Sequence, residues 1–252
     1  MGFDKLDVVR KLLAKAERAA TPEEAASYTD KALQLVARHG IDAAVLTAAD
    51  PARDRPRAQR VAVHEPYSAG KARLLAWTAA ALGCRAVLHQ QRGGRVGAVS
   101  VVGFAADRER VELLYTSLLL QAVAQLARLR PPPGESVAAF RRSWLHGFAV
   151  QVHRRLVEAE SDAAASGPSP DSAPGARTTT TTAVALAERA ERVDAAFAAA
   201  FPAPEPARGR SLTGSGFGSG AAAGERADLG GTGLGTGLGT GRGTAARRRI
   251  GV

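Results

Sequence analysis

Residues 140–156, FRRSWLHGFAVQVHRRL, place their large apolar side chains at the three- and four-residue spacing of one helical face. On a helical wheel these side chains fall within half a turn of one another and form a broad apolar face: Phe140, Trp144, Leu145, Phe148, Ala149, Val152 and Leu156. The pattern predicts a helix that begins after Ser136, ends near Glu160 and buries its aromatic face in a core.

The polar side of the same helix carries Arg142, His146 and His153. The two histidines are separated by two helical turns, which places their backbones about 10.5 Å apart along the axis. A zinc ion held by one helix normally takes ligands one turn apart. The spacing therefore predicts a solvated basic face without a shared metal. Arg141 and Arg155 fall on the apolar side, where their stems either extend to solvent or reach an acidic partner or a phosphate.

The segments before this helix complete an α+β unit that we expect over residues 61–160. Helical periodicity covers AGKARLLAWTAAALG (69–83) and residues 107–130, which PPPG ends. Strand-like runs occur in RVAVHEPY, CRAVLHQ and AVSVVGF, and the glycines between the last two suit a hairpin turn. The unit is therefore predicted to hold a small antiparallel sheet flanked by helices, with Cys84 as a buried structural thiol.

Residues 1–47 predict a helical hairpin ahead of this unit. Thr21 can cap the second helix, Glu24 completes a capping box three residues later, and Gly40 ends the helix. The hairpin is expected to be joined to the α+β unit by a linker over residues 48–60, which is rich in proline and charge.

The chain beyond the α+β unit alternates between spacer and helix. A disordered spacer is expected over residues 161–177, and a helix that packs on the α+β unit over residues 178–201. Residues 202–252 predict a disordered, basic, glycine-rich tail, because large apolar residues are scarce there. The predicted class is a mainly helical α+β protein.

The bulk composition is that of a globular protein rather than a membrane protein. Hydrophobic residues make up 45% of the chain, which is enough to bury a core. Cys84 is the single cysteine and Asp4 and Asp7 interrupt the start of the chain, so we expect a reducing, cytoplasmic location. The longest apolar run, at 117–127, is too short to span a bilayer, so no membrane partner is predicted.

The hairpin sequence RKLLAKAERAATPEEAASYTDKALQLVARHGID resembles the bacterial and phage family known as domain of unknown function 2786. Three later motifs are similar to the longer, actinobacterial-type members: VVGFAADRERVELLYTSLLLQA, FRRSWLHGF and ERADLGG. The family is uncharacterised, so the resemblance implies no catalytic residues. It implies only that most of the chain follows one family pattern.

The net charge of +10 favours a non-enzymatic binding protein with a possible nucleic-acid partner. Basic side chains on the hairpin, the 140–156 helix and the end of the tail are the candidate contacts: Lys5, Lys11, Lys15, Arg142, Arg247, Arg248 and Arg249. An equally simple interpretation is that the charge reflects composition and solubility alone. A protein-interaction module is a third interpretation, and the oligomeric state stays open.

A hydrolase is the alternative from a different class. It would use a spatial cluster of histidine and carboxylate side chains around His146, Asp107 or Glu112. No motif supports a metal or cofactor, because HEPYS (64–68) has Ser68 where a zinc-peptidase motif needs histidine. We therefore predict no cofactor, no metal and no catalytic residue from motifs.

Overall fold

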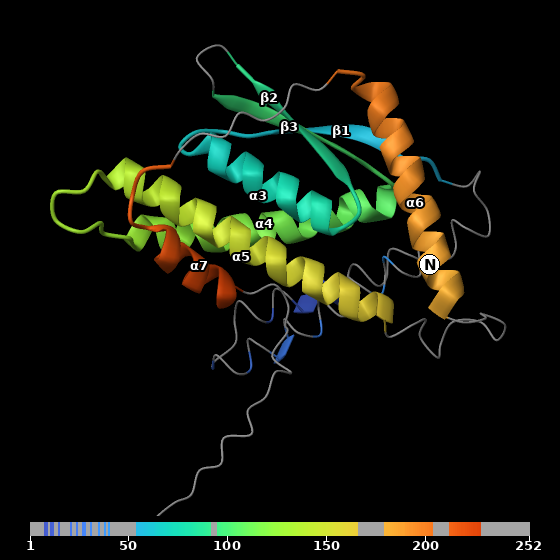
Figure 1. Ribbon diagram of the computed structural model, residues 1–252. Helices are drawn as coiled ribbons and strands as arrows, with labels where there is room; N and C mark the ends of the chain where they lie inside the picture. The colour runs from blue at the N-terminus through green and yellow to red at the C-terminus, as the bar shows by residue number, and fades with distance from the viewer. Residues whose placement is uncertain are drawn as a thin grey trace, which may run out of the picture.

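The computed structural model describes residues 54–91, 95–165, 179–203 and 212–227, together with scattered positions between 8 and 40. The elements follow the order β1 (Arg57–Ala62), α3 (Ser68–Ala81), β2 (Arg85–Gln90), β3 (Val96–Gly103), α4 (Ala105–Arg128), α5 (Val137–Ala165), α6 (Thr179–Ala200) and α7 (Phe217–Glu225) (Figure 1). This is the mainly helical α+β architecture that the sequence predicts. None of the helices in the described part of the chain is long and apolar enough to cross a membrane.

The sheet has the strand order β1-β3-β2, and both pairings are antiparallel. Val99 of the central strand pairs with Val61 of β1 and with Leu88 of β2. These β-branched and aliphatic side chains suit a pleated surface with one face in a core. The hairpin predicted between the second and third strands is therefore confirmed.

The two faces of the sheet meet different helices. Leu88 of β2 packs into the core cluster beside α3 and α4. Its neighbours on the same strand point the other way, because side chains alternate along a strand. Arg85 pairs with Asp194 of α6, and the His89 ring lies 6.1 Å from that of Phe201 just beyond α6. The helix predicted over residues 178–201 thus packs on the sheet from the side opposite α3.

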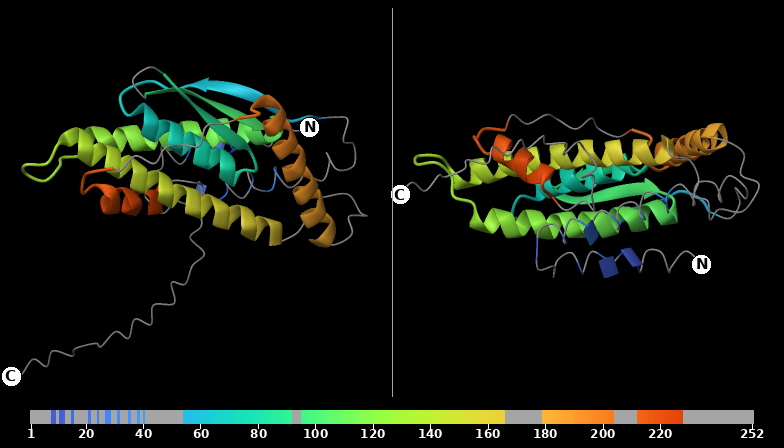
Figure 2. Two further views of the ribbon diagram at one scale, coloured as in Figure 1. Left: turned by 45° about the horizontal axis from the view of Figure 1, so that its top comes forward. Right: turned by 90° about the horizontal axis from the view of Figure 1, so that it is seen from below.

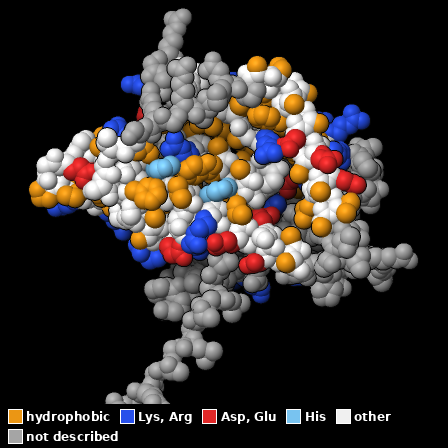
Figure 3. Space-filling view, in the orientation of Figure 1, with side chains coloured by type: hydrophobic (Ala, Val, Ile, Leu, Met, Phe, Trp, Pro, Cys, Tyr) orange, Lys and Arg blue, Asp and Glu red, His pale blue; other side chains and the backbone are white. Residues whose placement is uncertain are grey.

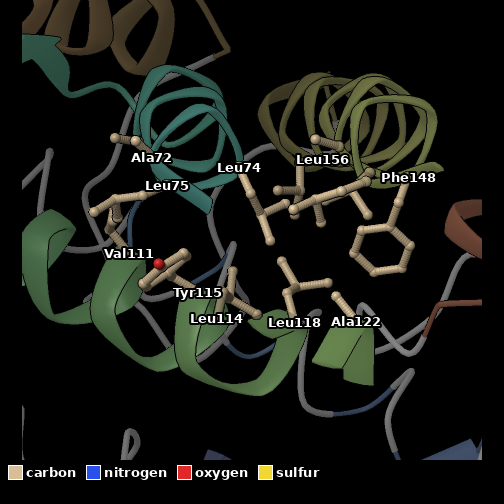
Figure 4. Packing of buried hydrophobic residues seen from close by; sticks show 14 of the residues in the cluster. Ala72, Leu74, Leu75, Val111, Leu114, Tyr115, Leu118, Ala122, Phe148 and Leu156 are labelled. Atoms are coloured by element: carbon tan, nitrogen blue, oxygen red, sulfur yellow. The ribbon is translucent and has the colours of Figure 1, made fainter. Parts of the chain in front are cut away.

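The main core lies between α3, α4 and α5 (Figure 4). Leu74 of α3, Leu118 of α4 and Phe148 of α5 point into this layer. Trp144 stacks on Phe148 with 5.3 Å between ring centroids and 14° between ring planes, and only 1% of Trp144 is exposed. The aromatic face predicted for residues 140–156 is confirmed as core packing, which contributes about 2 kcal/mol for each large side chain.

Two predicted boundaries are wrong. β1 begins at Arg57, so residues 57–60 of the expected linker belong to the sheet. The sequence RAQR predicts a linker because its residues do not alternate between apolar and polar. An edge strand with one solvated face can form without such alternation. At the other end, α5 continues to Ala165 and takes in residues 161–165 of the expected spacer. The alanines there favour helix even without a buried face.

The prediction of a wholly disordered tail is also wrong, because α7 lies within it. Gly216, Gly220 and Gly224 recur every four residues and line the side of α7 that faces α5. A Cβ atom at Gly220 would lie 1.9 Å from the Trp144 carbonyl oxygen, and one at Gly216 would lie 2.4 Å from that of Phe140. The glycines let the two backbones approach closely, so α7 gains its stability from packing rather than from helix propensity.

Polar contacts fasten both ends of α7. At its start, the Glu135 carboxylate accepts hydrogen bonds from the backbone and the hydroxyl of Ser215, at 2.7 and 2.6 Å. At its end, Nη1 of Arg155 donates to the carbonyl oxygens of Gly224 and Ala227, at 2.8 and 2.7 Å. A cation at a helix C-terminus satisfies carbonyl groups that have no partner within the helix. Arg155 therefore holds the end of α7, a role that the sequence did not suggest.

The described positions of the predicted hairpin lie against α4 (Figure 2). Val9 is fully buried in the core cluster. The Thr21 hydroxyl accepts a hydrogen bond from the Glu24 backbone at 3.1 Å, which confirms the helix start predicted there. A Cβ atom at Gly40 would lie 2.1 Å from Nη1 of Arg110 in α4, so the absence of a side chain at Gly40 allows this close approach.

Candidate functional site

A cleft of about 440 Å³ opens where the start of α3, the first half of α5 and the segment before α7 meet. Its walls combine basic, aromatic and apolar side chains: Tyr67, Ala69, Gly70, Arg73, Arg142, Leu145, Leu212 and Thr213. Gly70 brings α3 close to α5, because a Cβ atom there would lie 2.5 Å from Cδ2 of Leu145. The volume and the mixed lining are typical of a site for a small ligand or for one segment of a larger one.

Tyr67 enters the cleft from a strained turn. Its φ of 64° and ψ of 32° lie in the left-handed region, which costs a non-glycine residue about 1 kcal/mol. The following turn is held by Glu65, whose carboxylate accepts a hydrogen bond from the Ser68 hydroxyl at 2.7 Å. Strain of this kind persists only where its surroundings impose it, and it is concentrated at functional sites.

Two arginines face the cleft without a carboxylate partner among the described residues. Arg73 of α3 points its Nη1 at Nδ1 of His146, 3.1 Å away, and its guanidinium lies 5.7 Å from the centre of the Trp77 ring. Arg142, one turn before His146 on α5, is exposed. Among the described residues, no acid forms an ion pair with Arg73 or Arg142.

An aromatic strip continues from the cleft across α3, α5 and α7; we use the name for Trp77, His146, His153 and Phe217. The Trp77 ring centroid lies 5.6 Å from that of His146 and 6.0 Å from that of His153, and the His146 ring lies 5.6 Å from Phe217. Nδ1 of His153 donates to the Trp77 carbonyl oxygen at 3.1 Å. On the face shown in Figure 3, histidines lie among hydrophobic side chains.

The environment of His146 favours its neutral form. Burial and then the Arg73 guanidinium lower the pKa of this imidazole below its ordinary value. A neutral ring can accept the Arg73 hydrogen bond at Nδ1, whereas a protonated ring would donate from both nitrogens and repel the guanidinium. His146 therefore holds Arg73 in the wall of the cleft near neutral pH.

The three predicted basic contacts that the structure describes lie on two different parts of the molecule. Arg142 lines the cleft, whereas Lys11 and Lys15 are exposed on the segment that lies against α4. Nζ of Lys15 lies 5.6 Å from the centre of the Tyr28 ring within that segment. Four further predicted contacts lie outside the described residues: Lys5, Arg247, Arg248 and Arg249.

The histidine and carboxylate cluster considered for a hydrolase is not formed. Asp107 is 5% exposed and accepts hydrogen bonds from Arg189 at 2.8 Å and from Arg110 at 3.2 Å. Glu112 is exposed on α4. No carboxylate within the described ranges pairs with His146, whose ring contacts Arg73 and aromatic side chains instead. Asp107 of α4 instead binds Arg189 of α6 and so holds these two helices together.

A second cleft, of about 340 Å³, lies on the sheet face that α6 crosses, with Arg60, Ala62, His89, Gln90, Gln91, Gly97 and Ala98 around it. Nε2 of His89 lies 2.8 Å from the Ser100 hydroxyl oxygen. No described carboxylate orients this imidazole, so the pair lacks the third member of a nucleophile-activating triad. Nor does the described part of the chain group three or more histidine, cysteine or acidic side chains around one point suited to a metal ion.

Sequence reasoning placed Arg142, His146 and His153 on one face but missed their partners. Arg73 and Trp77 are one turn apart on α3. Because side chains four residues apart share a helical face, this spacing could have indicated that they act at one surface. Phe217 was missed because it lies in the segment predicted to be a disordered tail. The face of α5 expected to be merely solvated is partly covered, because both histidines lie beside the Trp77 ring.

Comparison with known proteins gives one match. A family model described as Protein of unknown function (DUF2786) matches residues 5–43. No curated protein and no solved structure matches the chain in these comparisons. The match supports the family resemblance of the hairpin, and it leaves the likeness to longer, actinobacterial-type members over the rest of the chain as a prediction.

Proposed function

We propose that this protein is a non-enzymatic binding protein that holds the phosphate groups of a nucleic acid in the cleft between α3 and α5. The observation that carries the proposal is the pair Arg73 and Arg142, which line one cleft and have no carboxylate partner among the described residues. A guanidinium presents several N–H donors in a plane that matches the oxygens of a phosphate.

The apolar part of the lining strengthens this interaction. Leu145 and Leu212 border the cleft beside the two arginines, so a bound phosphate would exchange part of its water for a surface of lower dielectric constant. Attraction between opposite charges is stronger in such surroundings than in bulk water. Arg73 is also held in place by His146, so less side-chain freedom is lost when a ligand binds.

The remaining predicted contacts act at longer range in this proposal. Lys5, Lys11, Lys15, Arg247, Arg248 and Arg249 would add salt-sensitive attraction outside the cleft, in keeping with the net charge of +10. The setting proposed is the cytoplasm, where the buried thiol of Cys84, with no second cysteine in the chain, stays reduced.

Fluorescence anisotropy with labelled oligonucleotides tests the proposal. The full chain is titrated at about 50 and about 200 mM salt, the range over which phosphate contacts lose most of their strength. Arg73→Gln and Arg142→Gln are each expected to weaken binding several-fold and to lower the dependence on salt by about one phosphate contact. The control is Arg154→Gln, which removes the same charge from α5 at a position paired with Glu158 and Glu225.

Binding that is absent at about 50 mM salt, or that Arg154→Gln weakens as much as Arg142→Gln, would show that the cleft is not the phosphate site. Circular dichroism of each variant would establish that the substitutions leave the fold intact.

A further inference from the structure

We propose that the nucleic acid bound here is single-stranded, and that an unpaired base stacks on the aromatic strip beside the cleft. This inference rests on the proposed function and adds to it the class of strand and the surface that receives the base. Three observations carry it: the link between cleft and strip, the exposure of Phe217, and the recessed shape of the arginine site.

Arg73 joins the cleft to the strip. Its guanidinium lines the cleft, points Nη1 at His146 and lies 5.7 Å from the centre of the Trp77 ring. A phosphate held by this arginine therefore lies next to aromatic rings. In a nucleotide, the base is likewise next to its phosphate, so one nucleotide unit can use both surfaces.

Phe217 presents the most open ring of the strip. It is 42% exposed, although it lies in the first turn of α7, close to the side of this helix that packs on α5. Its ring lies 5.6 Å from that of His146, which in turn lies beside Trp77. Stacking of bases on aromatic rings is the common device of proteins that bind single strands, because every base has a π-face.

The shape of the site disfavours a duplex. The arginines lie around a cleft of about 440 Å³ rather than on a flat or convex basic surface. A double helix keeps its bases stacked inside and offers only groove edges and phosphates. An unpaired base can turn outward and meet an aromatic ring, which a paired base does only after it leaves the stack.

The test compares one labelled oligonucleotide as a single strand and as a duplex, with the full chain. We expect the single strand to bind at least about 5-fold more tightly, since one stacked base contributes on this scale. Phe217→Ala is expected to weaken the single strand by a similar factor and to leave the duplex unchanged. The control is Val184→Ala, at a hydrophobic position on α6 that is 50% exposed.

Tryptophan fluorescence supplies a second measurement that a structural effect would not reproduce. Trp144 is buried in the core, so quenching by a bound base reports on Trp77. Single-strand binding should quench the emission of the wild-type protein, and Trp77→Phe should abolish the quenching while binding persists. Equal affinity for duplex and single strand, no quenching, or a free mononucleotide that binds as tightly as the oligonucleotide would overturn the inference and leave the phosphate site standing. Absence of binding to either strand form would overturn the proposed function as well.

Discussion

Nη1 of Arg73 lies 3.1 Å from Nδ1 of His146, so an arginine of α3 that lines the cleft and a histidine of α5 share a hydrogen bond. The imidazole must be neutral to accept it. Burial and then the nearby guanidinium lower the pKa of His146, so the neutral form is favoured in the folded protein. The contact therefore links the position of a proposed ligand-binding arginine to the protonation of one ring.

The free energy of unfolding should fall as the pH is lowered, because the His146 imidazole becomes protonated. Because the folded pKa of His146 lies below the unfolded value, the unfolded state takes up a proton first as pH falls from 6.5. The stabilisation that neutral His146 contributes is fully present above pH 6.5, the unfolded pKa. It is lost as the pH falls through the lower pKa of the folded state. We expect His146→Gln, which keeps an acceptor but does not titrate, to show a smaller fall in Tm between about pH 7.5 and about pH 5 than the wild type.

His89 contributes to the fall in Tm that remains in His146→Gln, because burial and then Arg60 lower its pKa as well. The control is His64→Gln, which replaces an exposed histidine outside the strip. A Tm that falls as steeply in His146→Gln as in the wild type would contradict the role given to His146.

The buried Asp107 carboxylate should be far more important for stability than an exposed one on α6. Asp107 receives hydrogen bonds from Arg110 and Arg189 in a site where water cannot replace it. Asp107→Asn is expected to lower the free energy of unfolding by about 3 kcal/mol, since it removes one negative charge that two buried guanidinium groups share. The matched control is Asp194→Asn, in the exposed pair with Arg85, for which a loss of at most about 1 kcal/mol is expected. Urea denaturation measures both, and similar losses would refute this account of Asp107.

The glycine spacing of α7 should decide whether this helix docks. A Cβ atom at Gly220 would meet the Trp144 carbonyl oxygen, whereas one at Gly218 would meet nothing within 4 Å. Gly220→Ala is therefore expected to speed hydrogen–deuterium exchange throughout residues 217–225. Gly218→Ala should leave exchange unchanged or slow it, because alanine favours helix by about 1 kcal/mol over glycine. Fast exchange in both variants, or in neither, would argue against docking through the glycines.

The helix of residues 140–156 could be predicted because one local pattern sets both its type and its buried face. Its large side chains recur at helical spacing, and Trp144 and Phe148 are indeed in the core. The cap formed by Thr21 and Glu24 was equally local, since both partners lie within one turn. Patterns of this kind need no knowledge of the rest of the chain.

α7 could not be predicted in the same way. Its glycines lower intrinsic helix propensity, and their advantage appears only when α5 supplies the carbonyl groups that they pack against. The partners of His146 were missed for a related reason, because Arg73 and Phe217 are far from it in sequence. The fold class could be predicted from local periodicity. The candidate site could not, because it depends on contacts between α3, α5 and α7, which are far apart in sequence.

Photo-cross-linking tests the central claim, that nucleic acid binds at the cleft and the strip beside it, most directly. A single-stranded oligonucleotide that carries 4-thiothymidine is irradiated with the full chain, and the cross-linked peptides are identified by mass spectrometry. The account predicts cross-links at Tyr67, Trp77, His146 or Phe217, and a several-fold lower yield of them in Arg142→Gln. Cross-links confined to residues 5–43 or 228–252, and unchanged in Arg142→Gln, would contradict it.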